Sequence, residues 1–173
     1  MGTLEESCRE TAIEGVLLQP LSVISTEGGP VLHLLRRDYA LMPYHQGFGE
    51  IYFSEVLPGA VKAWKRHLQQ SQLFAVPVGQ IRLVLYDDRE HTKSRGQVQE
   101  FLLGRPDNYC LLKIPPRIWY GFASLGNKPA LLCNCADLPH DPREAERLPQ
   151  DSERIPYRFH PDAGKSKLSG SPA

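Results

Sequence analysis

The stretch Gly59–Gly79, GAVKAWKRHLQQSQLFAVPVG, decides the fold class, because its first half alternates along the chain. Alternation with a period of two is typical of a half-buried β-strand. A strand over residues 61–67 would present two faces: Val61, Ala63, Lys65 and His67 on one, and Lys62, Trp64 and Arg66 on the other. In a small barrel the first face would line the interior, where one ligand can be held.

Short apolar runs fill most of the remaining chain, and 15 prolines and 14 glycines separate them. Short strands at such spacing are typical of an all-β sandwich or barrel. We predict strands at residues 15–18, 31–36, 50–56, 61–67, 73–78, 80–86, 98–103, 109–114, 118–122 and 130–135. One short helix is predicted near Pro142–Leu148, with the charged run Arg143–Arg147 on its outer face.

The length of 173 residues fits one domain with a single core. We predict that this domain spans residues 13–159. A flexible N-terminal arm, residues 1–12, would precede it. The small and polar stretch 160–173 would follow as a disordered tail.

The charge balance argues against several partners. Lys and Arg total 20, as do Asp and Glu, so no net charge draws the chain to nucleic acid or to an acidic membrane. The N-terminus is polar and unlike a secretory signal, which predicts a cytoplasmic protein. Cys133 and Cys135 would share one strand face, and we interpret them as buried free thiols rather than as a metal pair.

The spacing within Gly59–Gly79 resembles the first motif of metal-binding cupins, in which His-x-His and a Glu follow a glycine. Lys65 and His67 fall at the two His positions, and Gln72 falls at the Glu. The second motif resembles residues 115–120, with Tyr120 at its His. Protonated Lys does not bind metal, and Gln and Tyr are weak ligands for divalent transition metals, so we predict no metal and no cofactor.

Within the cupins, the chain resembles dTDP-4-dehydrorhamnose 3,5-epimerase and its divergent relatives. Four segments carry this resemblance: residues 48–64, 84–96, 111–126 and 140–157. It implies an all-β cupin, a double-stranded β-helix (jelly-roll) barrel, with the short helical segment near its C-terminal end. It also implies a dTDP-linked sugar as ligand and a homodimer.

The resemblance implies cofactor-free proton exchange at carbons beside a C4 ketone. Lys65 stands at the position of the family's His base, and Lys62 at that of an Arg. Tyr120 stands where the family has a His before Gly-Phe. The family's Tyr acid would lie at or beside Cys133, where this chain has no Tyr. We predict that Lys65 and Tyr120 form an altered acid/base pair.

We predict substrate contacts from Lys62, Trp64, His67, Gln72, Arg117 and Asn134. Other interpretations stay open. Lys65 could remain charged and bind phosphate, Tyr120 and Trp64 could be core residues, and His67 could be a satisfied interior residue or a new base. Lys62 would reach the interior only through a β-bulge or a dimer contact.

Three functions compete at this point. The first is a sugar-nucleotide epimerase or isomerase acting on a 4-keto-6-deoxyhexose by enolisation. The second is a non-catalytic cupin that binds a sugar nucleotide or a related ligand. The third, a metal-dependent oxygenase, is disfavoured by the ligand set. We favour the first, because the pocket positions remain polar and ionisable.

Overall fold

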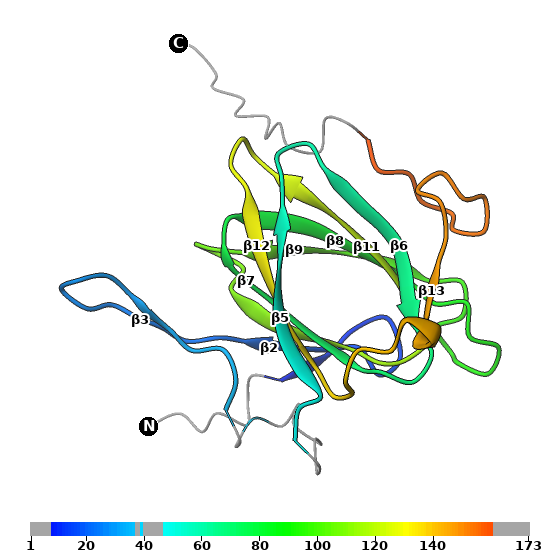
Figure 1. The fold of residues 1–173 in the computed structure, drawn as a ribbon, viewed down its shortest axis with the longest axis horizontal. Helices are drawn as coiled ribbons and strands as arrows, with labels where there is room; N and C mark the ends of the chain where they lie inside the picture. The colour runs from blue at the N-terminus through cyan, green and yellow to red at the C-terminus, as the bar shows by residue number, and fades with distance from the viewer. Residues whose placement is uncertain (1–7, 37–38, 40–46, 161–173) are drawn as a thin grey trace.

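The computed structural model describes residues 8–36, 39 and 47–160, and its architecture is two antiparallel sheets packed face to face. The first sheet has the order β1-β2-β10-β7-β12-β5, with bounds Arg9–Glu10, Leu17–Pro20, Cys110–Ile114, Gln72–Val78, Ala130–Ala136 and Glu50–Val56. The second has the order β13-β6-β11-β8-β9, with bounds Ala145–Arg147, Val61–His67, Trp119–Leu125, Gln80–Tyr86 and Val98–Gly104. Both curve around a common interior (Figure 1).

A third, two-stranded sheet is formed by β3 (Val23–Ile24) and β4 (Val31–Leu32). This hairpin projects away from the two main sheets (Figure 1). Within the predicted N-terminal arm, β1 pairs with β2, so residues 9–10 form the edge of the first sheet. Residues 1–7 and the predicted tail from 161 onward lie outside the described residues.

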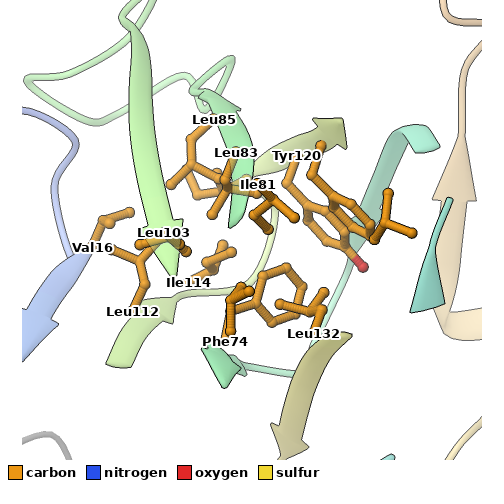
Figure 2. Packing of buried hydrophobic residues seen from close by; sticks show 14 of the residues in the cluster. Val16, Phe74, Ile81, Leu83, Leu85, Leu103, Leu112, Ile114, Tyr120 and Leu132 are labelled. Atoms are coloured by element: carbon orange, nitrogen blue, oxygen red, sulfur yellow. The ribbon is translucent and has the colours of Figure 1, made fainter. Parts of the chain in front are cut away.

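The interior between the main sheets holds the largest hydrophobic cluster. Figure 2 shows it running from Val16 and Leu112 to Phe74 and Tyr120. These side chains come from alternate positions of the strands, as the period of two requires. The polar candidates Lys65 and Tyr120 therefore belong to the inward face of the second sheet, where the sequence predicted them.

Two further clusters cover the outer faces of the sheets. Cys133 and Cys135 are buried free thiols on the outer face of the first sheet, beneath residues 32–35, as predicted. On the outer face of the second sheet, Trp64 and Trp119 pack beneath Ile155 and Phe159. The C-terminal segment thus buries apolar surface that the strand pattern alone would leave exposed.

The all-β jelly roll was predicted correctly, but the helix near Pro142–Leu148 was not. Only a single 3-10 turn forms, at Pro142–Glu144, capped by Asp141. The next three residues form β13 and pair with β6.

Within the described residues, no helix is long and apolar enough to cross a membrane. The cytoplasmic location stays a prediction.

Candidate functional site

A cavity of about 410 Å³ is lined mainly by residues of β5, β6, β7, β11, β12 and β13. Three cationic side chains line it, together with three hydroxyl groups and an apolar floor. These are Lys62, Lys65 and Arg147; Ser54, Tyr52 and Tyr120; and Phe74, Phe122 and Leu132. This volume suits one small ligand, and the lining offers it both apolar contact and hydrogen bonds.

A bulge in β6 brings Lys62 into the cavity. Tyr120 pairs with Lys65 and Phe122 pairs with Lys62, so three steps of β6 oppose two steps of β11. The extra residue moves Lys62 to the inward face. Lys62 thus reaches the interior through a β-bulge, one of the two routes that the sequence left open. Gly121 permits this approach, because a Cβ there would lie 2.6 Å from the Cβ of Ala63.

The Lys62 ammonium also joins the two sheets at the cavity wall. Its Nζ donates to Ser54 Oγ at 2.8 Å and to the Glu55 carbonyl oxygen at 2.6 Å. An ammonium has three donors, so one donor remains for a ligand. Lys62 is therefore held in place before any ligand binds.

Lys65 is the cation best placed to act as a base. Burial lowers the pKa of its ammonium, and the nearby Arg147 guanidinium lowers it further, against the opposing effect of Glu144. The Lys65 ammonium forms no hydrogen bond or ion pair within the described part of the chain. A half-buried lysine beside a second cation loses its proton more readily than an exposed one.

Tyr120 presents a protonated hydroxyl beside Lys65. Its ring is buried, edge-on to Phe74 at a centroid distance of 5.3 Å and parallel to the His67 ring at 6.2 Å (Figure 2 shows Tyr120 and Phe74). Burial raises the pKa of the Tyr120 phenol far above its usual range. The group thus stays a hydrogen-bond donor at neutral pH.

His67 lies behind Tyr120 and does not line the cavity. Its Nδ1 lies 2.5 Å from Glu144 Oε2, and Glu144 Oε1 accepts hydrogen bonds from the backbone N–H groups of Gln69 and Gln70. Burial lowers the pKa of His67 although the Glu144 carboxylate raises it. His67 therefore contacts the Tyr120 ring rather than the cavity, and its predicted contact with the substrate stays a prediction.

Gln72 and Asn134 likewise stand one layer behind the cavity wall. Both are buried, and Asn134 Nδ2 donates to Gln72 Oε1 and, at 2.8 Å, to Tyr52 Oη. Neither lines the cavity. Among the residues that the structure describes, no group of three or more His, Cys, Asp or Glu could hold a metal ion.

Trp64 and Arg117 were predicted as substrate contacts, and their side chains lie elsewhere. The Trp64 indole packs on the outer face of the second sheet and donates to the Gln150 carbonyl oxygen at 3.2 Å. This packing matches the alternative interpretation of Trp64 as a core residue, and Trp64 is also among the residues that line the cavity. Arg117 is exposed in the turn before β11, with a φ of 68°.

Sequence reasoning missed Tyr52 and Arg147. Tyr52 shares the inward face of β5 with Ser54 and Val56, and the alternation of residues 50–56 could have revealed this. Arg147 was placed on the outside of a helix. It instead pairs with Lys65 across β13 and β6 and lines the cavity.

Two curated proteins are similar to this chain over most of its length. The probable low-salt glycan biosynthesis epimerase Agl13 of Haloferax volcanii is 34% identical over 146 residues, which cover 84% of this chain and 88% of that protein. The spore coat polysaccharide biosynthesis protein SpsL of Bacillus subtilis is 31% identical over 150 residues, covering 86% and 97%. No family model matches the chain.

Solved structures confirm the fold. The crystal structure of a dTDP sugar isomerase from Desulfovibrio desulfuricans superimposes with a TM-score of 0.80 at 57% identity, covering 84% of this chain and 91% of that one. Crystal structures of dTDP-4-dehydrorhamnose 3,5-epimerases share the fold at 16% identity, with TM-scores of 0.72 and 0.74. The predicted cupin jelly roll is therefore confirmed.

Proposed function

Since the chain belongs to the RmlC-like cupin family of sugar-nucleotide epimerases and isomerases, we propose that it epimerises a dTDP-linked 4-keto-6-deoxyhexose by enolisation, with Lys65 as base and Tyr120 as acid. The observation that carries this proposal is the pairing of these two residues. They are direct neighbours across β6 and β11 and both line the cavity. No cofactor is required for this chemistry.

The two residues would act at different atoms of the substrate. Neutral Lys65 removes the proton from the carbon beside the C4 ketone, and the electron pair moves to the carbonyl oxygen. Tyr120 donates a hydrogen bond to this oxygen as it becomes an enolate. A donor held in a partly dry cavity before the reaction lowers the barrier more than a donor in water does.

The cations favour a ligand with a diphosphate. Lys65 and Arg147 lack an ion-pair partner among the described residues, and Lys62 keeps one donor free. Three positive groups around one cavity attract a dianionic group and form charge-assisted hydrogen bonds with its oxygens. The dTDP portion of the proposed ligand supplies such a group. The crystal structure at 57% identity is that of a dTDP sugar isomerase, which supports the same choice.

A homodimer is part of the proposal. β5 is the outer strand of the first sheet, and its outward residues Ile51 and Phe53 are 54% and 63% exposed. The projecting β3–β4 hairpin also exposes Val23 and Val31. An unpaired edge strand with large apolar side chains is suited to contact a second copy.

Proton exchange tests the function. The purified protein is incubated in deuterated buffer with dTDP-4-keto-6-deoxyglucose, and the H3 and H5 signals are followed by NMR. We expect both deuterium uptake and a new epimer with the wild type, and neither with Lys65→Ala. Tight binding of the nucleotide sugar without exchange would contradict the proposal and support the non-catalytic binding cupin instead.

A further inference from the structure

Lys65 and Tyr120 reach a bound sugar from the same side of the cavity. They project from neighbouring strands of one sheet and stand directly opposite in the β6–β11 register. Such cross-strand neighbours have Cβ atoms about 5 Å apart on one face. Epimerisation removes a proton from one face of a carbon and returns a proton to the other. These two residues therefore leave the second face without a donor.

Tyr52 occupies the other side. It lies on β5 in the first sheet, while Lys65 lies on β6 in the second, and both line the same cavity. Its neighbours Ile51 and Phe53 are exposed on the outer face, so the Tyr52 side chain is on the inward face. The cavity thus separates a phenol in one sheet from an amine in the other.

A chain of side-chain amides fixes the orientation of the Tyr52 hydroxyl. At the far end, Gln70 Nε2 lies 2.5 Å from the carbonyl oxygen of Leu138, which can only accept a hydrogen bond. Gln70 Oε1 must then accept from Gln72 Nε2, at 2.7 Å. Gln72 Oε1 accepts in turn from Asn134 Nδ2.

The same Asn134 nitrogen carries a second hydrogen, which it donates to Tyr52 Oη at 2.8 Å. The Tyr52 oxygen therefore accepts from Asn134, and its own proton must point elsewhere. Within the described residues the Tyr52 hydroxyl has no other partner. The open direction is the cavity that Tyr52 lines.

We propose that Tyr52 is a second catalytic acid, which protonates the sugar carbon on the face opposite Lys65 while Tyr120 serves the carbonyl oxygen, and that Asn134 is its positioning residue. The inference rests on the proposed function. The C–H bond breaks toward Lys65 Nζ and leaves an enolate. The enolate carbon then takes the Tyr52 proton, and the carbonyl re-forms. Water reprotonates the tyrosinate and accepts the proton held by Lys65, so the net reaction is an inversion.

The electrostatics of Tyr52 agree with this role. Burial raises the pKa of its phenol, so the group carries its proton at neutral pH. The Asn134 hydrogen bond and the Arg147 guanidinium act in the opposite direction, because both stabilise the tyrosinate. The acid is thus protonated at rest and supported after it has donated.

The test separates proton exchange from inversion. Tyr52→Phe removes the hydroxyl and keeps the ring. In deuterated buffer, we expect this variant to keep exchanging the substrate proton through Lys65 while inverted product forms on the order of 100-fold more slowly. Tyr86→Phe is the matched control, since Tyr86 lies on β8 outside the cavity and should keep the wild-type ratio of inversion to exchange.

The role of Asn134 is tested through the same ratio. Asn134→Leu should lower inversion relative to exchange, and the double variant Tyr52→Phe/Asn134→Leu should invert no more slowly than Tyr52→Phe alone. Equal loss of exchange and inversion in Tyr52→Phe would overturn the inference, as would no loss of either. A wild-type protein that neither exchanges nor inverts would overturn the proposed function, and this inference with it.

Discussion

Lys65 and Arg147 are cross-strand neighbours on β6 and β13, and this pairing matters for the proposed base. Burial of the Lys65 ammonium and repulsion from Arg147 both favour its neutral form. A lysine base works only without its proton. The proposed reaction therefore accelerates as the pH rises through the lowered pKa of Lys65.

Replacing Arg147 should move this pH dependence. Arg147→Met removes a positive charge, so the pKa of Lys65 rises and the ascending limb of the kcat profile shifts to higher pH. The rate at neutral pH falls as a result. The profile is measured at saturating substrate, which separates the shift from weaker diphosphate binding. Arg143→Met removes an equal charge at an exposed position paired with Asp141. An identical shift in both variants would rule out the local effect.

The positions of single residues were only partly predictable. The alternation of residues 61–67 placed Lys65 correctly, because the period of the strand sets that face. It wrongly placed Val61 and Ala63 on the same face, since both pack against the outer cluster beyond the bulge. Tyr52 could have been found from the alternation of residues 50–56, whereas Lys62 depends on a bulge that leaves no local pattern in the chain. Arg147 depends on a tertiary pairing with β6.

At the scale of elements, Gly121 allows β6 and β11, which form part of the cavity wall, to pack closely together. An added methyl group at Gly121 would lie 2.6 Å from Ala63 Cβ and 3.1 Å from the Trp64 and Phe159 rings. We expect Gly121→Ala to lower the free energy of unfolding by about 1–3 kcal/mol in denaturant titrations, as overpacking does. Gly28→Ala is the control, because nothing lies within 4 Å of its added Cβ. Equal stability of both variants would contradict the close approach.

The turn between β8 and β9 is organised by buried Asp87. Burial alone would raise the pKa of this carboxyl, but hydrogen bonds from Arg89, Ser94 and Thr92 lower it to about 2. A carboxyl with a lowered native pKa stabilises the fold above its unfolded pKa, and this contribution disappears as the pH falls from about 4 to about 2.

Asp87→Asn should remove this acid dependence. The shift from 3.8 to about 2 corresponds to about 2 kcal/mol of stability at neutral pH. We expect urea titrations of the wild type to lose that amount between pH 4 and pH 2, and those of Asp87→Asn to change far less. An equal loss of unfolding free energy between pH 4 and pH 2 in both proteins would mean that other carboxyl groups control acid unfolding.

The strands were predictable because most of them carry their own apolar pattern. Residues 50–56, 61–67 and 80–86 form β5, β6 and β8 at the predicted limits. Residues 142–148 instead have a charged composition that favours a helix. There the pairing of β13 with β6, which is a tertiary contact, overrides local propensity.

At the scale of the whole molecule, the exposed outer face of β5 suggests how two copies meet. Phe53→Asp places a charge on this face, and we expect sedimentation velocity to report a monomer where the wild type is a dimer. Leu102→Asp is the matched control, because Leu102 is about equally exposed on β9 of the other sheet. A dimer that survives Phe53→Asp and dissociates with Leu102→Asp would place the interface elsewhere.

The fold also explains why one cavity can hold a base and an acid apart. Each main sheet contributes polar side chains to an otherwise apolar interior, and these side chains enter the cavity from opposite sides. Lys65 and Tyr120 come from one sheet and Tyr52 from the other. The central step of the proposed mechanism is proton abstraction by Lys65.

The most direct measurement compares the initial rate of deuterium uptake into dTDP-4-keto-6-deoxyglucose for Lys65→Met and Lys62→Met. Each variant removes one cation from the same cavity wall. The account predicts that Lys65→Met abolishes uptake even at saturating substrate, whereas Lys62→Met mainly raises the substrate concentration needed for half the maximal rate. Uptake that persists in Lys65→Met, or that disappears equally in both variants, would contradict the assignment of Lys65 as the base.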